Sequence, residues 1–377
     1  MEIKLADCAA AVQKRLSDAG FECFVVGGCL RDILMGKTPK DWDLCTSAKP
    51  DQIKGCFADK RTVDTGIKHG TVSVVWEGER VEVTTYRTDG SYTDGRHPDR
   101  VDFSADLSED LARRDFTMNA IAWNPAAGIV DPFDGRRAIE ERKIIAVGEP
   151  RRRFEEDALR ILRGLRFASV LGFSLEENTA REAEACRLRL GSLSAERVQE
   201  EFSRLVLGEN VDEVLSRFSS VLKAAAPAMA EASVGGLPCC LPVRLAKLFP
   251  RDTEASLRRL KYDRKTIETA SALAGLDRQP FPRGSREMKE LLRREGVETA
   301  RLYFAARGRE AELQAILDSG ACWNLSQLAV TGADLLACGI SPGPEIGRRL
   351  NALLEVVVSG EARNEREELL SLARGEL

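Results

Sequence analysis

GGCLRDILMGKTPKDWDL, residues 27–44, is the stretch that decides how the first third of the chain is interpreted. It follows the apolar run FECFVV and therefore begins where a strand is expected to turn into a helix. Paired glycines at such a turn let backbone N–H groups approach phosphate oxygens, and the following helix N-terminus favours an anion. We expect Gly28 and Arg31 to bind phosphate here, although a plain tight turn and a surface arginine have the same pattern.

An acidic pair closes this stretch. Asp41 and Asp43 flank Trp42 in an expected strand at residues 41–45. Residues two apart on a strand face the same side, so both carboxylates are placed to bind one hard cation such as Mg²⁺. Glu82 is a candidate third acidic group if its strand lies beside the first. Most such acid pairs are surface residues, so the catalytic interpretation depends on the neighbouring glycine turn.

Composition limits the function classes. At 377 residues the chain is too long for one compact core, and two to four domains are expected. No apolar run has the length of a bilayer span, and the N-terminus lacks a signal-peptide pattern, which favours a cytoplasmic protein. Ten scattered cysteines without a C-x-x-C pair favour reduced, mostly buried thiols. The two histidines, His69 and His97, are too few for a zinc site or histidine-based catalysis to be favoured.

The pattern of apolar residues changes from mixed to helical along the chain. Thr71–Trp76 and Arg80–Tyr86 are β-branched runs that predict a hairpin, and residues 88–100 predict a loop. From Arg136 onward the spacing is helical throughout. Breaks are expected at residues 226–242 and 279–284, and the chain is helical again after residues 341–344. We therefore expect an α+β head with a small mixed sheet, followed by an all-α neck, body and tail.

Five motifs in order resemble those of one family. The stretch at residues 27–44 resembles the signature of the polymerase-β nucleotidyltransferase superfamily. The further motifs are similar to those of the class II tRNA nucleotidyltransferases, which comprise the CCA-adding enzymes and bacterial poly(A) polymerases: RRDFTMNA (113–120), DPFDG (131–135), EDALRILRGLR (156–166) and ERVQE (196–200). The resemblance covers residues 20–205, and the last segment resembles the C-terminus of shorter bacterial CCA-adding enzymes. It implies a catalytic head (1–137), a base-recognising neck (138–208), a body (209–275) and a tRNA-binding tail (276–377).

The resemblance also implies roles for individual residues. The acid pair Asp41 and Asp43 binds Mg²⁺, and two such ions activate the attacking 3′-hydroxyl and stabilise the leaving pyrophosphate. Glu82 is kept as a third catalytic acid. The residues implied to contact the incoming nucleotide are Gly28, Arg31, Arg114, Asp157, Arg160, Arg163 and Arg166.

Base choice is expected to depend on Asp157 and Arg160, which are three apart on a predicted helix and so share a face. Aspartate only accepts hydrogen bonds and arginine only donates them. Cytosine and adenine present an amino donor beside a ring-nitrogen acceptor, whereas uracil and guanine present the reverse pattern. Such a pair therefore accepts CTP and ATP and rejects UTP and GTP without a template. The alternative is an exposed helix whose arginines pair with Glu155 and Glu156.

RNA contacts must come from local patches, because the net charge is −4. Basic residues concentrate after residue 250, and we expect them to bind tRNA by its shape. The candidates are Arg258, Arg259, Lys261, Arg286, Lys289, Arg293 and Arg294. Each taken singly is also typical of a solvated helix face.

The favoured function is template-independent addition of C, C and A to the 3′ end of tRNA from CTP and ATP. The loop at residues 88–100 resembles the flexible loop needed for the switch from C to A, which favours the full product. The alternatives are a CC-adding or A-adding enzyme, a bacterial poly(A) polymerase, and an inactive RNA-binding relative. Nothing in the sequence indicates a membrane or a protein partner.

Overall fold

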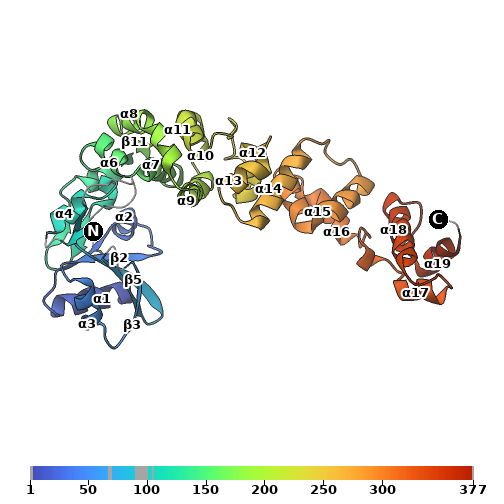
Figure 1. Cartoon of the computed structure of the whole chain (residues 1–377), viewed down its shortest axis with the longest axis horizontal. Helices are drawn as coiled ribbons and strands as arrows, with labels where there is room; N and C mark the ends of the chain where they lie inside the picture. The colour runs from blue at the N-terminus through green and yellow to red at the C-terminus, as the bar shows by residue number, and fades with distance from the viewer. Residues whose placement is uncertain (1–2, 67–69, 90–100, 104–105, 376–377) are drawn as a thin grey trace. The chain divides into compact units, whose positions relative to one another are not determined.

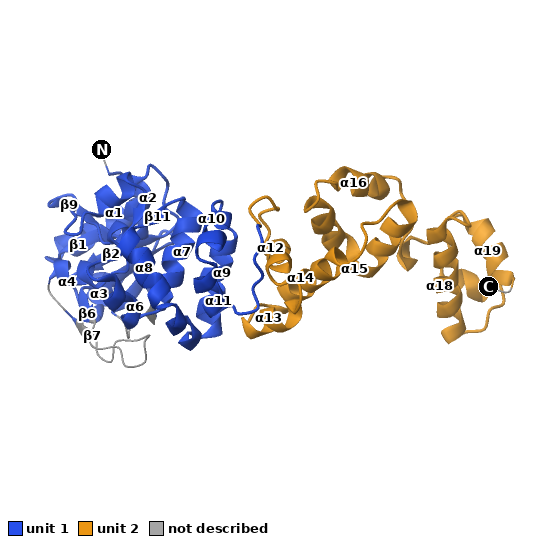
Figure 2. Cartoon of the chain, turned by 90° about the horizontal axis from the view of Figure 1, so that it is seen from above, with its two compact units in different colours: residues 1–233 blue, residues 234–377 orange. Residues whose placement is uncertain are grey.

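The computed structural model describes residues 3–66, 70–89, 101–103 and 106–375. It forms two compact units, Met1–Ser233 and Val234–Leu377 (Figures 1 and 2). Both histidines and residues 90–100 of the expected loop lie outside the described residues. Among the described residues, no helix has the length and apolar character needed to span a membrane.

The first unit contains both strands and helices, whereas the described elements of the second are all helices. The strands are β1 Cys23–Val26, β2 Trp42–Thr46, β3 Arg61–Gly66, β4 Thr71–Trp76, β5 Glu79–Thr85, β6 Arg87–Asp89, β7 Val101–Phe103, β8 Ala122–Asn124, β9 Gly128–Val130, β10 Lys143–Ile144 and β11 Ser174–Leu175. The helices of the first unit are α1 Asp7–Asp18, α2 Gly28–Leu34, α3 Pro50–Cys56, α4 Leu107–Ala112, α5 Gly135–Glu140, α6 Pro150–Glu156, α7 Leu159–Leu171, α8 Glu177–Ala185, α9 Ala195–Val206, α10 Val211–Arg217 and α11 Ser219–Ala225. Those of the second are α12 Leu241–Leu248, α13 Thr253–Arg259, α14 Arg264–Asp277, α15 Ser285–Ala305, α16 Glu310–Asp318, α17 Gly332–Ala337, α18 Pro344–Ser359 and α19 Arg366–Arg374.

The main sheet has the strand order β3-β4-β5-β2-β1-β8-β9. Only the pairing of β2 with β5 is parallel among these described strands, and the others are antiparallel. Helices α1 and α3 contact the sheet on one face. On the other face, Phe24 and Cys45 pack against Leu107 and Leu111 of α4. The predicted fold class, a mixed head sheet followed by helices, is confirmed.

The predicted hairpin is confirmed with a shorter turn than expected. Trp76 pairs with Glu79, so only two residues link β4 to β5. Glu77 and Gly78 both have positive φ, 50° and 90°, as a type I′ turn requires. The turn type matches the twist of the two strands and fixes their register, which in turn places the residues of β5 beside β2.

Three local predictions were wrong. Asp41 precedes β2, which begins at Trp42, so the acid pair does not lie wholly on a strand. The region after Arg136 is not helical throughout, because β10 and β11 form a short parallel pair. The helix expected to carry both Asp157 and Arg160 is interrupted at Asp157, whose backbone is extended (φ −149°, ψ 106°) and lies between α6 and α7.

The second unit confirms the predicted helix breaks. Helix α11 ends at Ala225 and α12 begins at Leu241, while α14 ends at Asp277 and α15 begins at Ser285. Helix α15 is kinked at Gly296 (φ 78°). The end of this unit has its own core, in which Leu335, Leu353 and Leu369 are fully buried. The cysteines are mostly buried, as expected: Cys8, Cys23, Cys29, Cys45, Cys186 and Cys322 lie in the interior.

Candidate active site

The glycine turn at the end of β1 lies against two charged side chains. Gly27 has φ 78° and ψ −139°, a conformation open to glycine, and α2 starts at the next residue. A Cβ on Gly27 would stand 3.2 Å from Nη1 of Arg114 and 3.8 Å from Oδ2 of Asp43. The fold therefore brings the turn and the acid of the first motif (27–44) to one place with an arginine of the second motif (113–120). Gly28, the glycine named from the sequence, lies instead near the guanidinium of Arg31.

Asp43 and Glu82 are neighbours across the parallel pair of β2 and β5. Residues in register point to the same face, so the two carboxylates share a side of the sheet. Burial raises the pKa of Asp43 to about 6; Arg114 opposes this shift, and the charges of Glu82 and Asp41 add to it. Asp41 and Glu82 are exposed, whereas Asp43 is half-buried. The three acids thus act on one another electrostatically even though Asp41 lies before the strand.

These acids offer the oxygen donors that a hard divalent cation prefers. A cation beside them would offset the mutual repulsion that contributes to the raised pKa of Asp43. In the part of the chain that the structure describes, no group of three or more His, Cys, Asp or Glu side chains is close enough to form a complete metal site. The fit is therefore one of donor chemistry and charge, with any further ligands left to substrate or water.

Arg114 is held by Asp110, a residue that the sequence analysis missed. The Asp110 side chain is fully buried and accepts hydrogen bonds from Arg113 (2.7 and 3.0 Å) and Arg114 (3.0 Å). Burial raises the pKa of Asp110, but the charges of Arg114 and Arg113 outweigh it, so its pKa lies below the usual range. The Nε of Arg114 is buried without a hydrogen-bond partner among the described residues. An acidic helix residue gives no sequence signal of this role.

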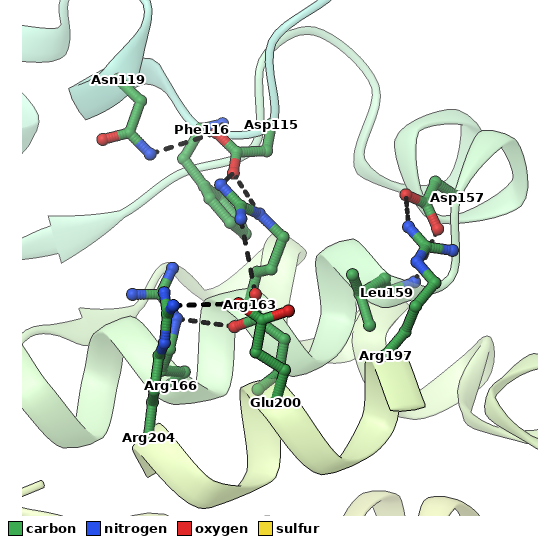
Figure 3. A network of polar contacts seen from close by, with 11 residues as sticks. Asp115, Phe116, Asn119, Asp157, Leu159, Arg163, Arg166, Arg197, Glu200 and Arg204 are labelled. Carbon is green, nitrogen blue, oxygen red and sulfur yellow. Dashed lines mark hydrogen bonds and ion pairs between the residues drawn. The ribbon is translucent and has the colours of Figure 1, made fainter. Parts of the chain in front are cut away.

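A polar network joins Arg31 to helix α7. Nη1 of Arg31 donates to Oδ1 of Asn119 (2.8 Å), and Nδ2 of Asn119 donates to Oδ1 of Asp115 (3.1 Å). Asp115 accepts from Nε and Nη2 of Arg163 at 2.8 and 2.7 Å (Figure 3). Burial alone would raise the pKa of Asp115. The charge of Arg163 and the hydrogen bonds from Arg163, Asn119 and the Phe116 N–H outweigh burial and lower this pKa to about 2. Arg163 therefore already neutralises a buried acid.

Arg166 is held in a similar way. Its Nε donates to Oε2 of Glu201 at 2.6 Å, and Glu201 also lies 3.5 Å from Nη1 of Arg163. The guanidinium groups of Arg31, Arg163 and Arg166 all lie over the ring of Phe167, at 5.1, 5.7 and 3.9 Å from its centroid. The structure thus gathers three of the predicted nucleotide-binding arginines around one ring. The sequence places Glu201 and Asp110 only as acids in ordinary amphipathic helices. It does not indicate that they hold arginines.

Asp157 and Arg160 do not share one helix as expected. Oδ1 of Asp157 accepts from the N–H of Leu159 (3.0 Å), and Oδ2 accepts from Nη2 of Arg197 in α9 (2.7 Å; Figure 3). Arg160 donates to Oε2 of Glu156 (2.8 Å) and to the carbonyl of Arg113 (3.1 Å). The interruption aims the Asp157 carboxylate at the start of α7. The role of this pair in base choice stays a prediction.

The basic residues proposed for RNA binding are exposed or half-buried in the second unit. Several form ion pairs on their own surface: Arg258 with Glu254, Arg286 with Glu290, Arg293 with Glu355, and Arg294 with Glu295. Arg259 and Lys289 have no ion pair within the described ranges. The patches therefore carry less free positive charge than their sequence suggests, and their contact with RNA stays a prediction.

Three family models match successive parts of the chain. They are described as the poly(A) polymerase head domain (residues 23–145), the "probable RNA and SrmB-binding site of polymerase A" (172–219) and tRNA nucleotidyltransferase domain 2 (243–373). Their order is that of the head and helical parts found in the structure.

Full-length relatives agree with these matches. The chain is 36% identical to a CCA-adding enzyme of Pediococcus pentosaceus, covering 96% of each chain. It is 37% identical to that of Geobacillus kaustophilus, covering 96% of this chain and 95% of the relative. The crystal structure of the Bacillus stearothermophilus CCA-adding enzyme in complex with CTP superimposes with a TM-score of 0.82 at 33% identity, over 97% of this chain and 96% of that one. The chain belongs to the family of CCA-adding enzymes, the class II tRNA nucleotidyltransferases.

Proposed function

We propose that this chain adds C, C and A to the 3′ end of tRNA from CTP and ATP, with release of pyrophosphate. One observation of the structure carries the proposal: the Gly27 turn, Asp43 and Arg114 lie within a few ångströms of one another. A phosphate-binding turn, a metal-binding acid and a phosphate-binding cation are the parts that nucleotidyl transfer needs. Similarity to CCA-adding enzymes over nearly the whole chain supports the choice of substrates.

Asp41 and Asp43 would hold Mg²⁺, with Glu82 as the third acid beside them. Bound Mg²⁺ supplies charge stabilisation at the reacting oxygens. The residues of the chain position the nucleotide around it. Arg114 has a buried Nε with no partner among the described residues, so an oxygen of the nucleotide is the acceptor that this N–H lacks.

Base choice would rest on Asp157 and Arg160, and the structure adds Arg197 as the residue that orients Asp157. Each carboxylate oxygen has two lone pairs, so Asp157 keeps acceptor capacity for the amino group of C or A beyond its bonds to Leu159 and Arg197. Arg31, Arg163 and Arg166 would meet the triphosphate. Arg163 and Arg166 already pair with Asp115 and Glu201, so each has less positive charge left to offset the negative charge of the triphosphate.

We assign the head (1–137) to catalysis, the neck (138–208) to base choice, and the body (209–275) and tail (276–377) to tRNA. The assignment is supported by the place of the acids in the sheet and of the family matches along the chain. A cytoplasmic location belongs to this proposal, because the tRNA substrate would be met there.

The test is incubation of the chain with tRNA lacking its 3′ CCA and with labelled CTP, ATP or both. We expect two C residues and one A, then termination. Asp43→Asn should abolish incorporation, whereas Asp51→Asn, an exposed acid of α3, should leave it unchanged. Long A tails would indicate a poly(A) polymerase, C or A alone a partial enzyme, and no incorporation an inactive relative.

A further inference from the structure

The second unit contains a cavity that no proposed role yet uses. It has a volume of about 440 Å³ and lies between α13, the loop before it, and α14. Its charged lining consists of Arg251, Arg258 and Arg278 with Asp252 and Glu254, and Ser271 of α14 adds a hydroxyl. Three guanidinium groups in one concave site outnumber its two carboxylates.

Ser271 provides an independent observation about this cavity, because its hydroxyl has unused hydrogen-bonding capacity. Its Oγ is buried and has no hydrogen-bond partner within the described part of the chain. Buried hydroxyls are rarely left unpaired, because losing their hydrogen bond to water costs about 1–3 kcal/mol. A serine on a helix normally satisfies itself by bonding back to a carbonyl one turn earlier. An acceptor entering the cavity would provide the partner that Ser271 lacks.

The arginines differ in how far they are already occupied. Arg258 donates to Glu254 at 2.8 and 2.9 Å, so this pair is neutral. Nη1 of Arg278 donates to the carbonyl of Pro250 at 2.9 Å, which orients the guanidinium and leaves its other N–H groups. Arg251 has no hydrogen bond or ion pair among the residues that the structure describes. With Arg258 and Glu254 paired, the remaining charges of the lining are those of Arg251, Arg278 and Asp252. The Asp252 side chain does not cap α13.

We propose that this cavity binds a phosphate group, and that the occupant is a phosphodiester of an RNA backbone. Planar guanidinium groups bind phosphate oxygens in pairs, and a hydroxyl adds a third donor. The volume exceeds that of a phosphate alone and leaves room for the sugar on either side. Taking the RNA to be tRNA rests on the proposed function. The cavity adds Arg251, Ser271 and Arg278 to the basic residues that the sequence indicated.

Salt dependence of tRNA binding tests the site directly. A plot of the logarithm of the tRNA association constant against the logarithm of salt concentration has a negative slope. Each lost phosphate contact should make this slope about one unit less steep and weaken tRNA binding about fivefold at 0.1 M salt. We expect this for Arg251→Ala and for Arg278→Ala, and a smaller loss for Ser271→Ala. Asp252→Asn should have the opposite sign and tighten binding. The matched control is Arg264→Ala, an exposed α14 arginine that pairs with Glu268 outside the cavity lining.

Fluorescence anisotropy with labelled tRNA gives these affinities without any catalytic step, so failure of C and A addition would not affect the result. Thermal unfolding of each variant identifies any that fail to fold, and Arg251→Lys should restore part of the slope. Equal affinity and slope in Arg251→Ala, Arg278→Ala and the Arg264→Ala control would overturn the proposal. Calorimetry with inorganic phosphate separates the sources: a variant that loses phosphate binding with an unchanged tRNA slope would show a free-anion site, which also overturns the RNA assignment.

Discussion

Gly27 has a positive φ and almost touches two charged groups of the site, so its substitution separates backbone strain from contact. In Gly27→Ala the new methyl would stand 3.2 Å from Arg114 Nη1, so this guanidinium must shift by a few tenths of an ångström, and the strained backbone adds to the change. We expect at least a hundredfold loss of CTP incorporation, with a loss of about 1–3 kcal/mol in the free energy of unfolding. Gly36→Ala is the control, because Gly36 also has a positive φ (72°) but nothing lies within 4 Å of its added Cβ. Equal activity of the two variants would contradict this account.

Asp115 makes stability depend on pH. Its pKa is lowered to about 2 in the folded state and lies near 3.9 in an unfolded chain. The folded state therefore binds fewer protons, and its advantage of about 2 kcal/mol is complete above about pH 5 and is lost as pH falls from there towards 2. Urea unfolding of Asp115→Asn and the unsubstituted chain should differ most at pH 7, and the difference should shrink below about pH 5 and vanish only at about pH 2 or lower. Asp59→Asn, which removes an exposed ion pair with Arg15, should show little effect at either pH.

Residues of the site differ in how visible they are in a sequence. Asp43 and Arg31 could be named as site residues from the sequence, because they lie beside a glycine turn and within an expected strand, which are both recognisable local patterns. Asp110 and Glu201 lie on helices where an acid usually faces water, and only the fold shows that they hold arginines. The sequence analysis named Gly28 and not Gly27, because the two glycines have the same local pattern. They differ only in the side chains that lie near them in the fold, Arg114 and Asp43 near Gly27 and Arg31 near Gly28.

At the scale of elements, turn chemistry was predictable and the break at Asp157 was not. Glycines and prolines in the sequence predicted the turn of the β4–β5 hairpin and the breaks before α12 and α15. The apolar spacing continues across the junction of α6 and α7, and Glu156 and Ala158 on either side of Asp157 are good helix formers, so periodicity favours one helix. The interruption is stabilised by distant partners, since Asp157 bonds to Arg197 forty residues later. Tertiary contacts of this kind override local propensity.

This contact between Asp157, at the junction of α6 and α7, and Arg197 of α9 gives a prediction about base choice. Arg197→Ala removes the partner of Asp157, so the carboxylate is no longer held at the start of α7. We expect discrimination against UTP to fall about tenfold, a loss of about 1.4 kcal/mol of differential binding. The control is Arg204→Ala in the same helix, which breaks only an exposed pair with Glu200 (Figure 3). Unchanged selectivity in Arg197→Ala, measured by single-turnover CTP and UTP incorporation, would count against the orienting role.

At the scale of the whole molecule, each compact unit has a hydrophobic core of its own residues. Core positions such as Phe24 and Leu111 lie in the first unit, and Leu353 and Leu369 lie in the second. A fragment of residues 1–233 should therefore unfold cooperatively and bind CTP within a few-fold of the full chain. It lacks the proposed phosphate cavity and every RNA-binding candidate after residue 250.

The same fragment separates nucleotide binding from the grip on tRNA. We expect its tRNA affinity to fall at least tenfold at 0.15 M salt, with a smaller salt slope, because several phosphate contacts leave together. Some affinity should remain, since the fragment keeps residues 172–219, which match a family model described as a probable RNA-binding site. Calorimetry with CTP and anisotropy with tRNA measure the two properties independently. A fragment that binds CTP normally and tRNA as tightly as the full chain would place the RNA-binding surface in the first unit, and the basic residues of α13 and α15 would then be solvated helix faces.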